Sequence, residues 1–261
     1  MNNGGIVLSL LFFSLLPITL LAERPSFELG FECTSYGYRE STETINSSAT
    51  PRSTRLTAKL SCHKTIPWVF SAAVPLSQSR GGERWLQNPG ILFQRNDLEE
   101  EYLSLAFHLH PFKRERRVFV GFRWDDLRQV RDNFSNAAGL VAYEDVESKW
   151  FEAGFRLALG KDNKGRRPWD KGGQISLVLG LAFDVHLTNT ALPGFVVDDS
   201  DGWLWRMDLQ FPSLGKTKVY PYFTYEKIHW DGSAWIPYGA TQARWPTNDT
   251  RAITFGLRCP F

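Results

Sequence analysis

Cysteine is scarce in this sequence, since the 261 residues contain only three, Cys33, Cys62 and Cys259. Three cysteines are too few for the disulfide framework of a small secreted domain, and their spacing does not match that of zinc ligands. Charge of one sign is also lacking, because the formal net charge is only +2. This balance predicts no nucleic-acid partner. The sequence contains no glycine-rich phosphate loop and no dinucleotide-binding motif, so it indicates no cofactor.

Long apolar runs are limited to one, residues 6–21, which is followed by Ala22 and the charged pair Glu23 and Arg24. About 16 apolar residues interrupted by Pro17 are short for a helix that spans a bilayer. A short apolar run before a small residue is typical of a secretory signal peptide. We therefore predict a signal peptide over residues 1–22 and one exported domain over residues 23–261.

The exported part is dominated by residues of alternating polarity, and it is rich in aromatic residues, with 10 Trp, 8 Tyr and 19 Phe in the sequence. In residues 174–187, for example, Leu177, Leu179 and Leu181 alternate with smaller or polar residues. About eleven such runs follow one another, separated by turn-rich segments. The period of two predicts an all-β domain.

The two faces of these predicted strands differ sharply. A soluble β-sandwich would also alternate, with its apolar face in a core. Here the apolar faces are long and uninterrupted, the opposite faces carry both signs of charge and glycine, and the leader predicts export. In lipid every backbone polar group must be paired, so strands cross only as a closed barrel, with about 9–11 residues per crossing. These features favour a membrane barrel.

The chain ends in ITFGLRCPF, in which Ile253, Phe255, Leu257, Cys259 and Phe261 share one face. This ending resembles the C-terminal strand of bacterial outer-membrane β-barrels, although an aromatic residue is common where Cys259 stands. The resemblance implies a closed antiparallel transmembrane β-barrel in the outer membrane. It also implies that this strand pairs with the first one and is read by the barrel-assembly machinery. Outer-membrane lipid and lipopolysaccharide would be further partners.

The resemblance also makes a prediction about the cysteines. All three fall at apolar positions of the first, second and last runs, and in a closed barrel those strands are neighbours. We therefore expect Cys33, Cys62 and Cys259 to face lipid on one wall.

The number of strands stays open between about 12 and 10, because single-chain bacterial barrels have even numbers. A twelfth strand could come from residues 234–243, or from residues 90–95 in a hairpin that turns at Asn96 and Asp97. Ten strands result if the weakly alternating residues 137–145 form none. We favour twelve.

The polar faces would line the barrel lumen. Buried charges must be paired or hydrated, so they predict either an ion-paired filling that supports the wall or a narrow channel for a small polar solute. The candidate lumen residues are Glu32, Lys59, Arg123, Glu152, Arg156, Asp184, Arg206, Asp208, Tyr220 and Tyr222.

Two other classes of function are alternatives. An outer-membrane lipid-modifying hydrolase, of the phospholipase or lipid A deacylase type, would need a serine and its base. Ser61 with His63, and Ser104 with His108 and His110, share strand faces, but such placement on one strand is common. The histidine pair also lacks an evident third metal ligand. A surface-interaction barrel would act through residues 40–53 and 78–101. We favour a channel or structural barrel without enzymatic activity.

Overall fold

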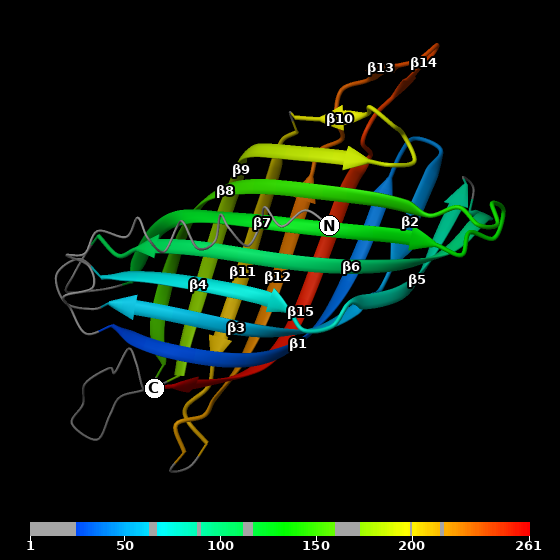
Figure 1. The fold of residues 1–261 in the computed structure, drawn as a ribbon. Helices are drawn as coiled ribbons and strands as arrows, with labels where there is room; N and C mark the ends of the chain where they lie inside the picture. Colours follow the sequence, from blue (N-terminus) through cyan, green and yellow to red (C-terminus); the bar gives the residue numbers. More distant parts are fainter. Residues whose placement is uncertain are drawn as a thin grey trace.

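The computed structural model describes residues 25–62, 67–87, 90–111, 117–159, 173–198, 200–214 and 217–261. The predicted signal peptide, residues 1–22, lies outside these ranges. Every regular element in the described part of the chain is a β-strand (Figure 1). No helix in these ranges is long and apolar enough to span a bilayer.

The described ranges contain fifteen strands, and several are longer than a membrane crossing requires. They are β1 (Ser26–Ser41), β2 (Ile45–Ala49), β3 (Arg52–Cys62), β4 (Trp68–Pro75), β5 (Ser79–Gln87), β6 (Ile91–Leu109), β7 (Val118–Asp132), β8 (Ala142–Leu159), β9 (Gly173–Asn189), β10 (Val196–Val197), β11 (Gly202–Gln210), β12 (Tyr220–Trp230), β13 (Ile236–Tyr238), β14 (Thr241–Ala243) and β15 (Thr247–Pro260).

The sheet closes on itself through antiparallel pairs. The last strand, β15, lies between β12 and β1, and the backbone N–H of Phe261 donates to the carbonyl of Phe27 at 2.8 Å. We call this edge of the barrel, where β1 begins and β15 ends, the terminal end, and the opposite edge the distal end. The circuit near the terminal end runs β1, β3, β4, β6, β7, β8, β9, β11, β12 and β15.

Two further strands complete the wall at the distal end. After a break, β2 continues the line of β3 along β1, and β5 continues the line of β4 along β6. The wall therefore contains twelve strands, of which ten are met in one circuit near the terminal end. The prediction of a closed antiparallel barrel of about twelve strands is confirmed (Figure 1).

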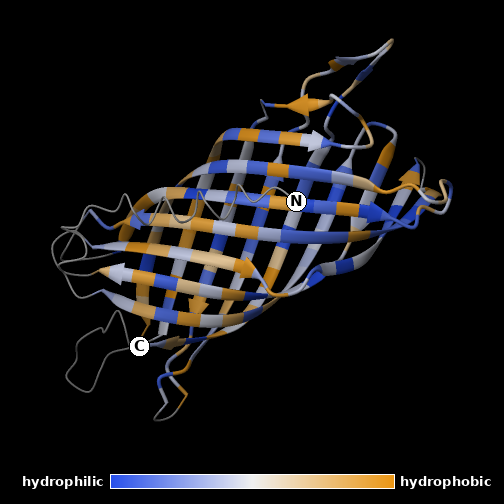
Figure 2. Cartoon of the chain, in the orientation of Figure 1, coloured by the Kyte–Doolittle hydropathy of each residue, from blue (hydrophilic) through white to orange (hydrophobic). Residues whose placement is uncertain are grey.

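Apolar side chains on the outer surface form a belt around the terminal part of the barrel. Figure 2 shows hydrophobic and hydrophilic residues alternating along the strands, as a wall with one apolar face requires. An exposed apolar surface of this extent is rare in soluble monomers and matches a hydrocarbon layer. The belt includes Phe31, Leu56, Val74, Phe122, Phe151, Phe155, Leu177, Leu179, Leu181, Phe183, Ile253, Phe255 and Leu257.

The cysteine prediction is confirmed for two residues and wrong for the third. Cys33 is exposed on β1, and Cys259 is half-buried on the neighbouring β15. Cys62 is buried instead, at the last position of β3, where it lies opposite the buried Trp68. Within the described residues none of the three cysteines forms a disulfide.

The distal wall differs from the strand predictions made for it. Residues 90–95 form no separate hairpin, because β6 runs unbroken and Asn96 and Asp97 pair within the sheet. Residues 234–243 contribute no barrel strand, since they contain the small separate sheet of β13 and β14. Of residues 137–145, only the part from Ala142 onward is strand, as the beginning of β8.

Candidate functional site

Arg123 on β7 is the centre of an ion network that fills the lumen. Its Nε donates to Asp125 at 2.8 Å, its Nη1 donates to Glu226 at 2.5 Å, and its Nη2 donates to the hydroxyl of Tyr102. The Arg123 side chain is 3% exposed. A buried charge is costly unless it is paired and its donors are satisfied. These partners meet that condition and connect β6, β7 and β12.

Glu152 on the neighbouring strand β8 also belongs to the network, and its side chain is fully buried. It lies 2.6 Å from Nε2 of His108, 3.5 Å from Nη1 of Arg206 and 3.6 Å from Nη1 of Arg123. Arg206 also contacts Asp208 at 3.3 Å. The network therefore spans the lumen from wall to wall.

Towards the terminal end, shorter chains of ion pairs continue the filling. Glu32 contacts Arg55 at 2.5 Å and accepts a hydrogen bond from the hydroxyl of Tyr222, also at 2.5 Å. Lys59 pairs with Glu28 at 3.1 Å. In this part of the lumen six acids meet six bases, so the formal charges cancel. The acids are Glu28, Glu32, Asp125, Glu152, Asp208 and Glu226, and the bases are Arg55, Lys59, Arg123, Arg156, Arg206 and Arg258.

Glycine on the inner wall makes room for large rings. Tyr222 lies directly opposite Gly256, and Trp230 lies directly opposite Gly202. A Cβ atom on Gly256 would come within 2.3 Å of the tyrosine ring, and one on Gly202 within 2.4 Å of the indole. Each ring therefore lies flat over a position that only glycine fits, which closes the bore further.

Aromatic residues form a plug in the distal half of the lumen. The ring centroids of Trp150 and Trp230 are 4.7 Å apart, and those of Trp230 and Trp245 are 5.7 Å apart. Trp245 comes from the segment between β14 and β15, so a connecting segment folds into the mouth. The aromatic plug also contains Val146, Val185, Leu187, Phe195, Val197, Leu204 and Ile228.

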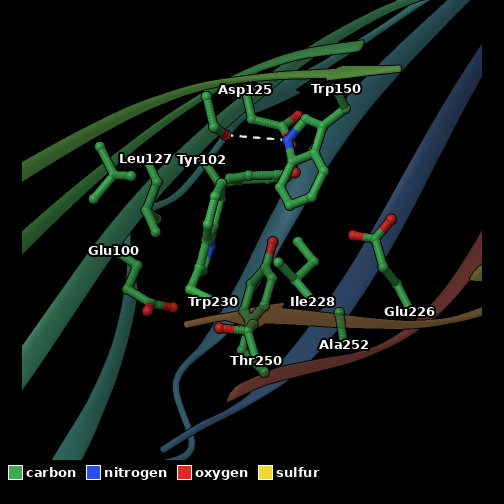
Figure 3. Close-up of a pocket in the computed structure, with 13 residues that line it drawn as sticks. Glu100, Tyr102, Asp125, Leu127, Trp150, Glu226, Ile228, Trp230, Thr250 and Ala252 are labelled. Carbon is green, nitrogen blue, oxygen red and sulfur yellow. Dashed lines mark hydrogen bonds between the residues drawn. The ribbon is translucent and has the colours of Figure 1, made fainter. Parts of the chain in front are cut away.

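A cavity of about 50 Å³ remains between the aromatic plug and the Arg123 network. Figure 3 shows Asp125, Tyr102, Trp150 and Glu226 around it, with side chains converging from several strands. A cavity of this size is large enough to hold water, and its polar lining offers hydrogen-bond partners.

The barrel has similar structures among solved proteins, although its sequence matches none of the known families. No family model and no curated protein matches the sequence. Among solved structures, the outer membrane protease OmpT from Escherichia coli is similar, with 8% identity, a TM-score of 0.52 and coverage of 91% of this chain and 96% of that one. The β domain of the Bordetella autotransporter BrkA shows 13% identity, a TM-score of 0.45 and coverage of 90% and 100%. The fold is that of a bacterial outer-membrane β-barrel. Identities this low show the fold alone.

The distal end of the barrel holds a cluster of buried acids. Arg131 contacts Glu40 and Glu83 at 3.0 Å each and Glu144 at 3.7 Å, and Glu100 is buried beside them. We call these five residues the distal acidic cluster. Four carboxyl groups here share one guanidinium, in contrast to the balanced charges nearer the terminal end.

The distal acidic cluster lies beyond the apolar belt, and burial changes the pKa of its carboxyl groups. Desolvation raises the pKa of Glu40 from 4.5 to about 7, against the opposing effect of Arg131. Desolvation also raises the pKa of Glu100 from 4.5 to about 7. Burial raises the pKa of Glu144 as well. Protons therefore offset part of the surplus negative charge.

We expect the barrel to be more stable at about pH 5 than at about pH 8. Because the carboxyl pKa values are higher in the folded chain, the folded state binds more protons, and its stability falls as the pH rises from about 4.5 to about 7. Chemical unfolding followed by gel mobility measures the difference. Glu100→Gln should reduce it, whereas Glu99→Gln, on the outer face beside Arg80, should not. A midpoint that rises with pH over this window contradicts the expectation.

Nine of the ten candidate lumen residues lie on the inner side of the wall. They are Glu32, Lys59, Arg123, Glu152, Arg156, Arg206, Asp208, Tyr220 and Tyr222. The structure brings most of them into the ion pairs described above. That they form a pathway for a solute stays a prediction.

Asp184 is the exception, and its lumen assignment is wrong. It is exposed on the outer surface and contacts Nζ of Lys149 at 2.5 Å. The pairing of β8 and β9 skips one residue, since Lys149 lies opposite Asp184 while Trp150 lies opposite Ala182. Such a β-bulge reverses the alternation beyond it, so Val185 faces the lumen in place of Asp184.

Several residues of the site were absent from the sequence-based set. Glu226 follows Tyr220, Tyr222 and Thr224 on the same face, so continuing that alternation by one step finds it. Arg131 lies on the face of Arg123, but both faces of β7 become polar beyond the belt. Where both faces of a strand are polar, alternation no longer shows which residues point into the lumen.

The residues considered for a lipid hydrolase have other surroundings. His108 is bonded to Glu152, and Ser61 shares a hydrogen bond of 2.7 Å with Ser26. The ring of His110 packs against Phe119, with centroids 5.6 Å apart. His63 lies outside the described residues. Within the described ranges no group of three or more His, Cys, Asp or Glu side chains could hold a metal ion.

Proposed function

We propose that the protein is a sealed outer-membrane barrel that supports an interaction surface at its extracellular end. The observation that carries this proposal is the filled lumen. The Arg123 network crosses the bore, the aromatic plug lies above it, and a cavity of about 50 Å³ is left between them. A narrow channel for a polar solute would require both layers to move.

The proposed placement follows from the belt and the chain ends. We infer that the signal peptide at residues 1–22 exports the chain, and that the assembly machinery reads the closing strand that ends at Phe261. The apolar belt then contacts outer-membrane lipid, with lipopolysaccharide around its outer edge. The terminal end faces the periplasm in this arrangement, so the distal end faces outward.

The distal wall supports a role in interaction. Residues 40–53 and 78–101, which the sequence identified as candidate surface segments, contribute to β1, β2, β5 and β6 where they rise beyond the belt. Their outward side chains are charged near the belt, as at Glu99 and Glu101, and β-pairing holds them in fixed positions. A paired wall presents side chains more rigidly than an unstructured loop would.

We expect the purified barrel to show no single-channel conductance in a planar lipid bilayer. The reason is the ion-paired and aromatic filling, which leaves no continuous water path. An open porin measured in the same bilayer confirms that insertion and recording work. Reproducible conductance steps from the unaltered protein would contradict the sealed barrel and favour the channel.

A further inference from the structure

Two arginines face each other near the distal tip of the wall. Arg84 on β5 lies directly opposite Arg95 on β6, and both are exposed. Like charges placed directly across a strand pair destabilise a sheet. Within the described ranges, no carboxylate lies within ion-pair distance of either guanidinium. An anion bound between them would remove the repulsion.

The arginines line an open hollow of about 450 Å³, which also includes Gly82 and Asn133. We call it the arginine hollow. Gly82 contributes no side chain, and a Cβ atom there would meet nothing within 4 Å. The amide of Asn133 supplies a polar group at the edge. The space is large enough for a phosphate group and part of its substituent.

The two acids that line the arginine hollow are already engaged. Asp97 accepts hydrogen bonds from Arg80 at 3.0 Å and from Asn133 at 2.9 Å. Glu83 turns to the lumen, where its side chain is fully buried and pairs with Arg131. Neither carboxylate therefore neutralises the arginine pair, and the hollow keeps a local positive charge.

An apolar tip lies beside the arginine hollow. At the start of β6, Ile91 is 64% exposed, Leu92 is 41% exposed and Phe93 is 50% exposed. Along the outer face of β6 the belt ends at Leu103, charged residues follow, and the apolar tip comes after them. Three consecutive exposed apolar side chains indicate contact with an apolar partner rather than with water.

We propose that the apolar tip and the arginine hollow together bind the surface of an anionic phospholipid membrane. The phosphate group occupies the hollow between Arg84 and Arg95, and Ile91 and Phe93 enter the acyl boundary. Amphipathic elements with basic flanks bind lipid surfaces in this way, through apolar burial and attraction to anionic lipid. The inference rests on the proposed function, because it gives the extracellular surface a ligand.

The lipid in question belongs to a second membrane. Phe93 lies ten residues beyond Leu103, or about 34 Å along the strand, so the tip stands away from the belt's own bilayer. A second copy of the chain fits poorly, because two tips would bring four arginines together. Charge complementarity therefore favours an anionic lipid surface.

Vesicle co-flotation of the full-length barrel in nanodiscs tests the inference. The vesicles contain phosphatidylcholine alone or with a third of phosphatidylglycerol. We expect binding to the anionic vesicles only, weakened by salt. Replacing both arginines, as Arg84→Ser with Arg95→Ser, should weaken it roughly 30-fold. Ile91→Ser with Phe93→Ser should weaken it through the apolar tip, and Gly82→Leu should do so by filling the hollow.

The control removes the same charge from the same end of the barrel. Arg39→Ser with Arg128→Ser changes two outward arginines away from the hollow and should leave binding within twofold of the unaltered protein. Gel mobility confirms that every variant is folded.

Equal binding to neutral vesicles would overturn the inference, and so would an equal loss in the control variant. Displacement by soluble glycerol phosphate with no effect of the tip variants would also overturn it, because it indicates a free anion as the ligand. Binding only to lipopolysaccharide micelles would exclude a phospholipid surface. If the protein shows no conductance in a planar bilayer and also does not bind vesicles, only this inference is refuted. If it shows conductance steps but binds anionic vesicles, only the sealed barrel is refuted.

Discussion

Replacing Arg123 with alanine should lower the free energy of unfolding by about 3–5 kcal/mol, which is the usual cost of removing one partner from a buried ion pair. The loss arises because Asp125 and Glu226 stay buried after their shared cation is gone. Unfolding by guanidinium chloride in lipid vesicles, followed by tryptophan fluorescence and gel mobility, measures the change.

Arg128→Ala is the matched control, since it removes the same side chain from the same strand. The Arg128 guanidinium is 53% exposed and lies 3.7 Å from Asp145 on the outer surface. An exposed pair of this kind contributes about 0–1 kcal/mol. If the two variants lose similar stability, the Arg123 network does not hold the barrel together as described.

Strand alternation predicted the barrel well because one face of each crossing strand must be apolar. Ile253, Phe255 and Leu257 show this at the seam, where the predicted neighbour β1 is found. A single added residue reverses the predicted facing of the residues beyond it, as at Asp184, because alternation in the sequence does not reveal a β-bulge. Beyond the belt the contrast between the two faces is lost, so β2 and β5 were not predicted. The distal part of β6 was predicted only as a possible separate hairpin strand over residues 90–95.

The partners within the lumen were beyond sequence reasoning for a different reason. Arg123 and Glu226 are 103 residues apart in the chain, and only the register of the closed sheet brings them together. Trp245 enters the aromatic plug from a connecting segment without any periodic pattern. Inward-facing charges are thus predictable as a class, whereas their pairing depends on tertiary structure.

The distribution of charge links the lumen to the proposed surface. Nearer the terminal end acids and bases balance, so burial there does not leave unpaired charge. Surplus acid is confined to the distal acidic cluster inside the wall, where Glu83 also pairs with Arg131. On the outer face of the same strand, Arg84 has no acidic partner among the residues that the structure describes. One strand, β5, therefore presents an acid to the lumen and a base to the outside, which is consistent with the proposed anion-binding surface.

Replacing Trp230 with alanine should also cost about 3–5 kcal/mol of unfolding free energy, because a buried tryptophan leaves a cavity that its surroundings cannot close. Trp230 is 6% exposed, packs against Trp150 and Trp245, and covers Gly202. The hydrogen-bonded wall prevents the strands from collapsing inward. Gel mobility in denaturant measures the loss without depending on the removed fluorophore.

Trp235→Ala supplies the comparison, because Trp235 is 55% exposed. The Arg244 guanidinium lies over its ring, 4.8 Å from the ring centroid. The loss in this variant should stay below about 1 kcal/mol. In the proposed sealed barrel the Arg123 network closes the bore separately from the aromatic plug, so the Trp230 variant should remain without conductance in a planar bilayer. Conductance steps in that variant would show instead that the plug is the only seal, and that the charged layer beneath it admits ions.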